Sequence, residues 1–190
     1  SQNVLTTLFS TDDTKKNEDF SEKTIAELVR ACFEMGKVKT GALIVIERGT
    51  PLGEIERTGI EVDGIVTSQL LINIFEHNTP LHDGAVVIRG NRVTAATCYL
   101  PLSDNMDISK ALGTRHRAAV GVSEATDSVT LVVSEETGRV SVAVSGRLKS
   151  VKDGDELRDI LSVLVKRETE NTGRFRIWKG RRRNERKADE

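Results

Sequence analysis

Residues 84–99 read GAVVIRGNRVTAATCY, and this stretch determines the fold class. It contains two apolar runs rich in β-branched residues, Gly84–Arg89 and Arg92–Tyr99, which are typical of strands. Between them stands Gly90-Asn91, a pair that suits a tight turn. We therefore expect a β-hairpin here, and we expect it to form the centre of a sheet.

Further strands are predicted on both sides of this hairpin. Residues Ala42–Glu47 form a short β-branched run between two glycines, which is the pattern of a buried strand. Later in the chain, Val129–Ser134 and Arg139–Ser145 are separated by the turn sequence EETG at 135–138. These two runs predict a second hairpin.

Four helices are predicted from apolar residues that recur at helical spacing. They cover Ser21–Gly36, Thr67–Phe75, Thr114–Glu124 and Asp155–Val165. Thr24 and Glu27 fit a capping box in the first helix, and Thr114 fits the N-cap of the third. Helices at both ends and between the strands predict an α/β fold, a single domain with a central mixed β-sheet flanked by helices.

The length of 190 residues fits one ordinary domain with residues left over for tails. Residues 1–20 are polar without sustained periodicity and predict a linker, so we expect the folded domain to span residues 21–166. Residues 167–190 predict a charged, flexible C-terminal tail. The longest apolar runs are far shorter than the roughly 20 residues of a membrane-spanning helix, and no secretion signal is visible.

The formal net charge of −1 argues against a global basic field that would gather nucleic acid. The segment 171–190 alone carries eight basic and three acidic side chains, a local charge of +5. A solvated tail is the favoured interpretation, and a contact with nucleic acid or anionic lipid is the alternative. Cys32 and Cys98 stand in apolar patterns where buried residues are expected, which favours a reducing cytosol.

A first candidate site begins at the predicted helix start Thr114-Arg115-His116-Arg117. Three potentially cationic side chains occupy this first turn, where the helix dipole disfavours positive charge. Free backbone N–H groups, a hydroxyl and two guanidinium groups at one helix start suit a polyphosphate. The alternative is that both arginines point to solvent or pair with nearby carboxylates, and the pattern favours neither interpretation.

A second candidate site lies in residues 79–85, TPLHDGA, just before a predicted strand. Gly84 would let a ligand approach the backbone, and Asp83 could bind a divalent metal or accept a proton from a hydroxyl. The alternative is a plain turn in which Asp83 bonds its own backbone and Gly84 supplies a special φ. The nearby His77 is expected to be a helix cap or a surface residue.

The motifs Asp83-Gly84-Ala85 and Arg115-His116-Arg117 together resemble the paired motifs of the diadenylate cyclase domain family, which makes cyclic di-AMP from ATP. The resemblance is to the membrane-anchored, housekeeping branch of that family, and it covers about residues 21–165. It extends over four stretches, which are Asn78–Ala85, Tyr99–Ser103, Gly113–Gly121 and Val133–Gly138.

This resemblance implies a metal-assisted reaction in which the 3′-hydroxyl of each ATP attacks the α-phosphate of the other and two pyrophosphates leave. The implied catalytic residues are Asp83, Arg115, His116 and Arg117. The implied ATP-binding residues are Gly84, Ala85, Tyr99, Leu100, Thr114, Ser134, Glu135 and Glu136. The implied metal ligands are Asp83 and His82, and the implied cofactor is a divalent metal, Mn²⁺ or Mg²⁺, with Co²⁺ as a further option.

The same chemistry implies a homodimer, because two ATP sites must face each other before the ring can close. The branch carries membrane-spanning helices ahead of its cyclase domain, so we expect this chain to be a soluble fragment of a parent at the cytoplasmic face of the cell membrane. The resemblance further implies a membrane-anchored regulator and a phosphoglucosamine mutase as partners, and no nucleic acid.

Two other functions stay open from the residues alone. A metal-dependent phosphodiesterase or nucleotide hydrolase would use His82, Asp83 and His116 around a metal, although such sites usually draw on more Asp and His ligands. A non-catalytic nucleotide sensor would bind ATP without turnover. Asp83 argues against the sensor, because a pure binder gains nothing from a carboxylate beside a triphosphate.

Overall fold

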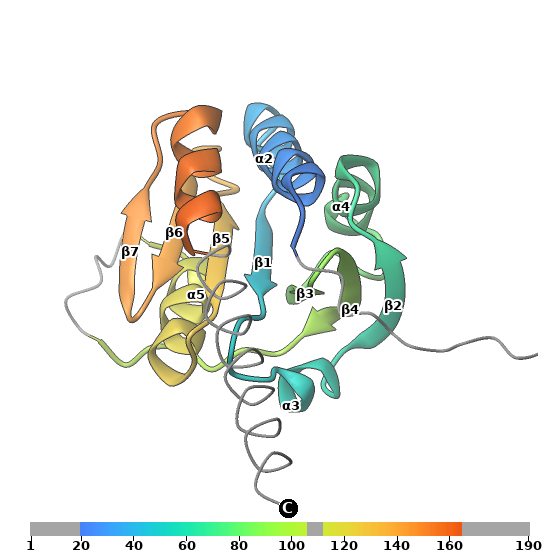
Figure 1. The fold of residues 1–190 in the computed structure, drawn as a ribbon, viewed down its shortest axis with the longest axis vertical. Helices are drawn as coiled ribbons and strands as arrows, with labels where there is room; N and C mark the ends of the chain where they lie inside the picture. The colour runs from blue at the N-terminus through green and yellow to red at the C-terminus, as the bar shows by residue number, and fades with distance from the viewer. Residues whose placement is uncertain (1–19, 106–111, 165–190) are drawn as a thin grey trace, which may run out of the picture.

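The computed structural model describes residues 20–105 and 112–164 of the chain. The expected linker, apart from Phe20, and the expected tail at 167–190 lie outside the described residues. Within the described part, a mixed sheet stands between two layers of helices (Figure 1). The predicted fold class, an α/β domain with a central sheet flanked by helices, is therefore confirmed.

The described residues form one seven-stranded sheet in the order β2-β4-β3-β1-β5-β6-β7. Its strands are β1 (Ala42–Ile46), β2 (Ile60–Ile65), β3 (Ala85–Arg89), β4 (Arg92–Cys98), β5 (Val129–Val133), β6 (Val140–Val144) and β7 (Arg147–Ser150). β1 and β3 are parallel, and the other neighbouring pairs are antiparallel. Both predicted hairpins are confirmed, as β3–β4 and β5–β6. The central strand is β1, however, so the expectation that the β3–β4 hairpin forms the centre of the sheet was wrong.

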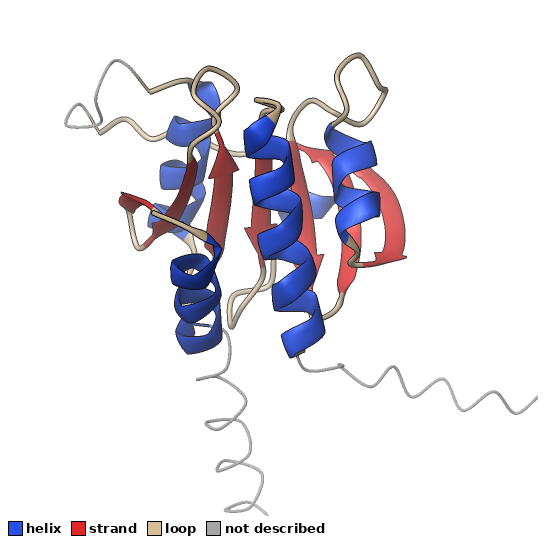
Figure 2. Ribbon diagram, turned by 90° about the horizontal axis from the view of Figure 1, so that it is seen from above, coloured by secondary structure: helices blue, strands red, loops and turns tan. Residues whose placement is uncertain are grey.

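Helices cover both faces of this sheet (Figure 2). One face carries α2 (Glu22–Lys37), α4 (Ser68–Phe75) and the last described helix at 154–164, and the other carries α3 (Gly53–Glu56) and α5 (Thr114–Ala125). Neighbouring side chains of a strand point to opposite faces. In β1, Ala42, Ile44 and Ile46 therefore join the core under α2. Leu43 and Val45 join the core under α5.

Two helix starts differ from the sequence prediction. The N-cap of α2 is Ser21, whose hydroxyl accepts from the backbone N–H of Thr24 at 3.1 Å. Thr24 is not a cap, because it lies inside the first turn and its own hydroxyl donates to Asn91 at 2.6 Å. Glu27 forms no capping box with it. The carboxylate of Glu27 accepts instead from the backbone N–H of Ser68 at the start of α4.

In α5 the N-cap is Gly113, which has an extended backbone, and Thr114 is the first helical residue. The expectation that Thr114 caps this helix was therefore wrong. Because Gly113 has no side chain, no side-chain hydrogen bond caps α5. The N–H groups of His116 and Arg117 donate to the carbonyl oxygen of Gly113, which leaves those of Thr114 and Arg115 for another acceptor.

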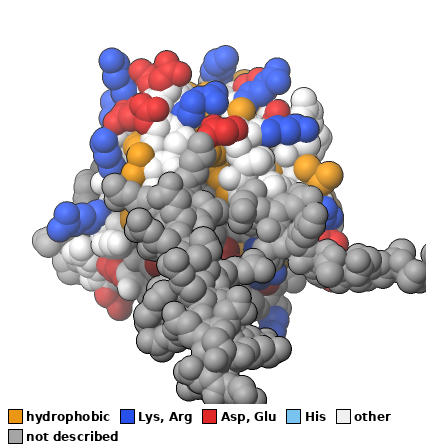
Figure 3. All heavy atoms as spheres, in the orientation of Figure 1, with side chains coloured by type: hydrophobic (Ala, Val, Ile, Leu, Met, Phe, Trp, Pro, Cys, Tyr) orange, Lys and Arg blue, Asp and Glu red, His pale blue; other side chains and the backbone are white. Residues whose placement is uncertain are grey.

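Charges of both signs are interspersed over the helices on the face shown in Figure 3, in keeping with the net charge of −1. Both cysteines are buried, as the sequence predicted. In the described part of the chain, no helix has the length and the apolar character needed to cross a membrane.

Candidate functional site

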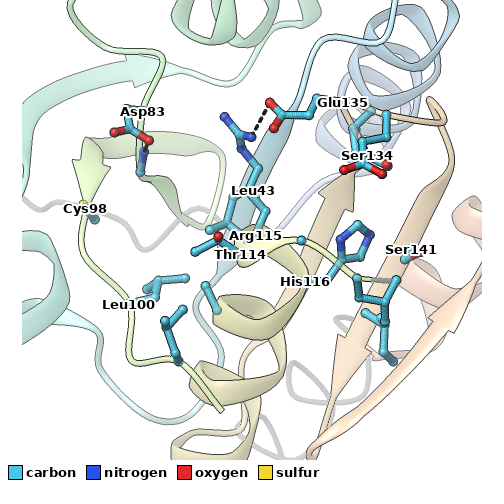
Figure 4. Close-up of a pocket in the computed structure, with 18 of the residues that line it drawn as sticks. Leu43, Asp83, Cys98, Leu100, Thr114, Arg115, His116, Ser134, Glu135 and Ser141 are labelled. Carbon is cyan, nitrogen blue, oxygen red and sulfur yellow. Dashed lines mark hydrogen bonds and ion pairs between the residues drawn. The ribbon is translucent and has the colours of Figure 1, made fainter. Parts of the chain in front are cut away.

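A cavity of about 1090 Å³ opens where the start of α5 meets the ends of several strands (Figure 4). This volume is slightly above the range of about 300–1,000 Å³ that is typical of small-molecule sites. Ten of the predicted site residues line the cavity: Asp83, Gly84, Tyr99, Leu100, Thr114, Arg115, His116, Ser134, Glu135 and Glu136. The topology thus joins the two candidate sites, which lie about thirty positions apart in the sequence, into one.

Asp83 and Gly84 form the turn that leads into β3. The backbone N–H of Gly84 donates to Asp83 Oδ1 at 2.9 Å, and Gly84 has a φ of +82°. A Cβ on Gly84 would lie 2.9 Å from the carbonyl oxygen of Cys98, so this position needs glycine for two reasons. The plain-turn interpretation is therefore right about the backbone. The exposed carboxylate of Asp83 nevertheless lines the cavity.

Two residues of this region lie outside the cavity lining. Ala85 is fully buried and faces Cys98 across the β3–β4 pair, so the structure does not bear out a direct contact between Ala85 and a nucleotide. His82 is half-buried, and its Nδ1 lies 2.7 Å from the carbonyl oxygen of Thr79. Because a carbonyl only accepts, Nδ1 carries a proton and Nε2 is the nitrogen left for other contacts.

The His82 ring also packs edge-on against His77, with 5.6 Å between ring centroids. His77 is exposed, as expected for a surface residue, and the C-cap of α4 is Glu76. Among the described residues, no three His, Cys, Asp or Glu side chains cluster as a preformed metal site. A cation in this cavity would therefore take part of its ligands from a substrate.

Arg115 reaches from the first turn of α5 across the cavity to the β5–β6 turn. Its Nη1 lies 2.8 Å from Glu135 Oε2, and the pair is drawn with a dashed line in Figure 4. The Arg115 side chain is 23% exposed and that of Glu135 is 64% exposed. Arg115 therefore pairs with a carboxylate, as the alternative interpretation expected, and it also lines the cavity. That it binds a polyphosphate stays a prediction.

His116 is buried at the start of α5, only 7% exposed, with its ring directed into the cavity region between Thr114 and Ser141 in Figure 4. Burial lowers the pKa of His116 from its ordinary value of 6.5, because an imidazolium is poorly solvated there. The positive charge of Arg115 also lowers this pKa, and the carboxylate of Glu136 opposes both effects. His116 is therefore neutral near pH 7, which removes one of the three charges expected at this helix start.

Arg117 takes a different place from the one the sequence suggested. Its Nη2 donates to the carbonyl oxygen of Ser103 at 3.0 Å, and the Ser103 N–H donates back to the carbonyl oxygen of Arg117 at 3.0 Å. Arg117 does not line the cavity. In this structure it fastens the loop after β4 to α5, and the expectation that it holds phosphates stays a prediction.

The remaining predicted residues form opposite walls of the cavity. The Tyr99 side chain is exposed, and its backbone N–H donates to Thr58 Oγ1 at 2.8 Å, while Leu100 is buried. On the far side, Ser134 accepts from the N–H of Thr137 at 3.2 Å in the β5–β6 turn, which also presents Glu135 and Glu136.

Sequence reasoning missed several lining residues: Leu43, Ile60, Thr97, Cys98, Leu102, Arg139, Ser141, Leu148 and Ser150. The alternation of β1 could have assigned Leu43 to the α5 face. Arg139, which follows the Ser134–Gly138 turn, adds a second guanidinium. Cys98 is not a nucleophile here, because burial raises the pKa of its thiol to about 11.

The assembled cavity combines three kinds of chemistry. Guanidinium groups and the uncapped start of α5 suit phosphates, and carboxylates at Asp83, Glu135 and Glu136 are hard oxygen ligands of the kind that Mg²⁺ and Mn²⁺ prefer. Apolar side chains such as Leu43 and Leu100 suit a flat base. Together these groups fit a nucleoside polyphosphate with a divalent cation.

The relatives of this chain agree with that chemistry. The family model described as "DAC: DisA bacterial checkpoint controller nucleotide-binding" matches residues 29–148. Cyclic di-AMP synthase CdaA from Bacillus subtilis (strain 168) is 50% identical over 166 residues, covering 87% of this chain and 61% of that protein. The chain thus spans less than two thirds of that relative.

Two solved structures share the fold. DacA from Staphylococcus aureus, crystallised as a double mutant, superposes with a TM-score of 0.73 at 48% identity, covering 74% of this chain and 94% of that chain. A hypothetical membrane spanning protein from Bacillus cereus superposes with a TM-score of 0.66 at 42% identity, covering 68% and 64%. Since the family model alone matches more than half of the residues, the chain belongs to the DAC family of nucleotide-binding domains.

Proposed function

We propose that this chain is a diadenylate cyclase that condenses two ATP molecules into cyclic di-AMP and two pyrophosphates. The observation that carries the proposal is one cavity lined by both the Asp83 carboxylate and the start of α5 with Arg115. The names of the relatives, cyclic di-AMP synthase and DacA, support the same activity.

In the proposed reaction, the 3′-oxygen of one ATP forms a bond to the α-phosphorus of the other while the bond from that phosphorus to pyrophosphate breaks. The hydroxyl must lose its proton as it attacks. Asp83 is the carboxylate placed to accept that proton, since Oδ1 takes one N–H from Gly84 and Oδ2 has no such bond within the turn. Gly84 holds the turn at a φ of +82° and lets the backbone of Thr97 and Cys98 approach, which keeps Asp83 and Gly84 at the cavity wall.

The phosphates are assigned to the start of α5. The Thr114 hydroxyl and the backbone N–H groups of Thr114 and Arg115 would provide neutral donors, and Arg115 would provide a forked cation for two phosphate oxygens. His116, neutral at pH 7, serves as a hydrogen-bond partner and not as a charge. The base is assigned to the opposite wall, with Tyr99 against its face and Leu100 beside it.

A divalent metal ion, Mn²⁺, Mg²⁺ or Co²⁺, fits the carboxylates that line the cavity, with Asp83 as the proposed ligand. His82 would contribute through Nε2, the nitrogen that Thr79 leaves free. When bound, such an ion would offset the charge that builds up on the reacting phosphate and on pyrophosphate. Arg115 would supply part of the same stabilisation from the protein.

The reaction further requires a homodimer. One cavity of about 1090 Å³ would hold one ATP, and the second ATP must be presented from outside it. A face-to-face arrangement of two copies about a two-fold axis would bring two identical cavities together. ATP binding would itself stabilise such a dimer, because a ligand that contacts both copies adds its binding energy to the interface.

We also propose that the full-length parent works at the cytoplasmic face of the cell membrane, with a membrane-anchored regulator and a phosphoglucosamine mutase as partners and without nucleic acid. The name of the Bacillus cereus relative, a hypothetical membrane spanning protein, supports a membrane location for that protein. Flotation of the full-length protein with membrane vesicles, and co-purification of the two partners with it, would test this part.

The activity is tested by incubating the chain with ATP and Mn²⁺ or Mg²⁺ at several protein concentrations and identifying the products by mass spectrometry. Cyclic di-AMP is expected, with a rate per protomer that rises with protein concentration, because the active species is a dimer. ADP or AMP as the product would point to the hydrolase instead. Bound but unchanged ATP would point to the sensor.

A further inference from the structure

Gly41, the buried residue just before β1, lies directly beneath the Arg115–Glu135 ion pair. A Cβ placed on Gly41 would lie 2.8 Å from Arg115 Nη1 and 2.9 Å from Arg115 Cζ. It would also lie 3.1 Å from Glu135 Cβ. The guanidinium therefore packs onto the bare Cα of Gly41 in a space that any side chain would occupy.

The backbone gives no other reason for glycine at this position. Gly41 does not have a φ in the left-handed region, in contrast to Gly84 at +82°. The φ of Gly41 therefore does not exclude alanine. The requirement for glycine comes from the neighbouring side chains alone.

The clash expected for an alanine at position 41 is also one that a side-chain movement can relieve. Atoms closer than 3.0 Å must move apart, and the atoms nearest to the added Cβ belong to the far end of a flexible arginine side chain. An alanine at position 41 would push the Arg115 guanidinium away, would require Glu135 Cβ to shift by a few tenths of an ångström, and would leave the strand in place. The cost would then fall on the position of Arg115 and not on the stability of the fold.

We propose that Gly41 is a positioning residue whose bare backbone seats the Arg115 guanidinium in the orientation that binds substrate phosphate. This inference rests on the proposed function, since it assigns a purpose to the orientation of Arg115. A forked guanidinium binds two phosphate oxygens only when its plane is correctly placed, and small misplacements of catalytic groups reduce rates strongly.

The first test is Gly41→Ala, with Gly53→Ala as the matched control because a Cβ on Gly53 would meet nothing within 4 Å. For Gly41→Ala we expect kcat/KM for ATP to fall by about 10-fold or more, with most of the change in KM, while the melting temperature stays close to that of the wild type. Gly53→Ala should keep the wild-type kcat/KM, KM and melting temperature. Wild-type kcat/KM in Gly41→Ala would overturn the proposal.

A double-mutant cycle tests whether Gly41 acts through Arg115. The readout is the affinity for 3′-deoxy-ATP, which lacks the attacking hydroxyl and so binds without reacting. Gly41→Ala should weaken binding in the wild-type background and have no further effect in the Arg115→Ala background. An equal loss in both backgrounds would overturn the proposal, because Gly41 would then act without Arg115.

A third readout needs no nucleotide and separates this inference from the proposed function. In the NMR spectrum of the ligand-free protein, the Arg115 Nε–Hε resonance should move in Gly41→Ala and stay in place in Gly53→Ala. An unmoved resonance in Gly41→Ala would overturn the seating of Arg115. A chain that shows the shift and makes no cyclic di-AMP would overturn the proposed function and leave the seating of Arg115 intact.

Discussion

The guanidinium of Arg115 and the carboxylate of Glu135 lie 2.8 Å apart, which joins the start of α5 to the β5–β6 turn across the cavity. Glu135 therefore already pairs with the guanidinium that we assign to substrate phosphate. A phosphate that binds there has to displace Glu135 or share Arg115 with it. The ion pair is mostly exposed on the Glu135 side, so it is weak enough to be exchanged.

Glu135→Gln should strengthen nucleotide binding when no metal ion is added. An exposed ion pair is worth about 0.2–1 kcal/mol, so removing the competing carboxylate should lower the Kd for 3′-deoxy-ATP by up to about fivefold. Titration calorimetry in the presence of a chelator measures this change. Glu34→Gln, which breaks the Arg30–Glu34 pair on the far helix α2, is the control and should leave the Kd unchanged. Weaker binding by Glu135→Gln would contradict the competition.

Asp83→Asn should abolish cyclic di-AMP formation while the fold survives. An amide oxygen can still accept the Gly84 N–H, so the turn keeps its hydrogen bond, but the amide cannot take a proton from the 3′-hydroxyl. Loss of a general base typically lowers the rate by about 10²- to 10⁴-fold. Mass spectrometry checks the loss of product, and the circular dichroism spectrum checks that the fold survives. Full activity in this variant would remove the role assigned to Asp83.

Arg139→Ala should raise the KM for ATP with little change in the melting temperature. Arg139 lines the cavity beside the β5–β6 turn and is exposed, so its guanidinium can reach a phosphate without supporting the core. We expect about a 3- to 10-fold increase in KM, which steady-state kinetics measures. Arg147→Ala, which removes an exposed arginine from the edge strand β7, is the control. An unchanged KM in Arg139→Ala would place Arg139 outside the phosphate site.

Arg117→Ala should lower stability more than it lowers phosphate affinity. Arg117 fastens the loop after β4 through the Ser103 carbonyl, and one such hydrogen bond is worth about 1 kcal/mol. Chemical denaturation should show a loss of this size. The Kd for inorganic pyrophosphate should stay within about twofold of the wild type, because Arg117 lies outside the cavity lining. A large loss of pyrophosphate affinity at unchanged stability would restore a phosphate role for Arg117.

The lowered pKa of His116 makes stability depend on pH. Burial is the main cause, so the folded chain resists a proton that the unfolded chain takes up near pH 6.5. The contribution of His116 is fully present above pH 6.5 and is lost as the pH falls from there toward the folded pKa. Urea denaturation at about pH 7.5 and about pH 5.5 measures the free energy of unfolding at each pH. This free energy should fall more between the two for the wild type than for His116→Gln. Equal drops would show that His116 titrates alike in both states.

The strongly apolar elements could be predicted from the sequence because their signal is local. The continuous run of β3 and the helical spacing of Ile25, Leu28 and Cys32 in α2 each reflect burial, and burial is what the structure shows. α3, β2 and β7 lacked such a signal. β2 is an edge strand in which the exposed Glu61 and Asp63 interrupt the apolar residues, so it carries no apolar run. Its pairing with β4 also shifts in register between Glu61 and Gly64.

The candidate site could be predicted in its parts and not in its assembly. The helix start at Thr114 and the turn at Asp83 each carried a chemical signal, but only the sheet order brings them to one cavity. Arg117 was assigned with Arg115 because the two are close in sequence. Residues two apart on a helix point in different directions, which explains why Arg115 faces the cavity and Arg117 faces Ser103.

The sheet also separates the molecule into two packing layers, which meet at the β5–β6 turn, where Gly138 lies against Gly36 of α2. Apart from Val133, the core residues that line the cavity belong to the α5 side, while α2, α4 and the last described helix pack on the opposite face. Replacing Leu28 by another side chain of similar volume would therefore alter the scaffold without touching the nucleotide. A volume-conserving substitution in the α2 layer should therefore act through packing, whereas a substitution at the start of α5 should act on the cavity itself.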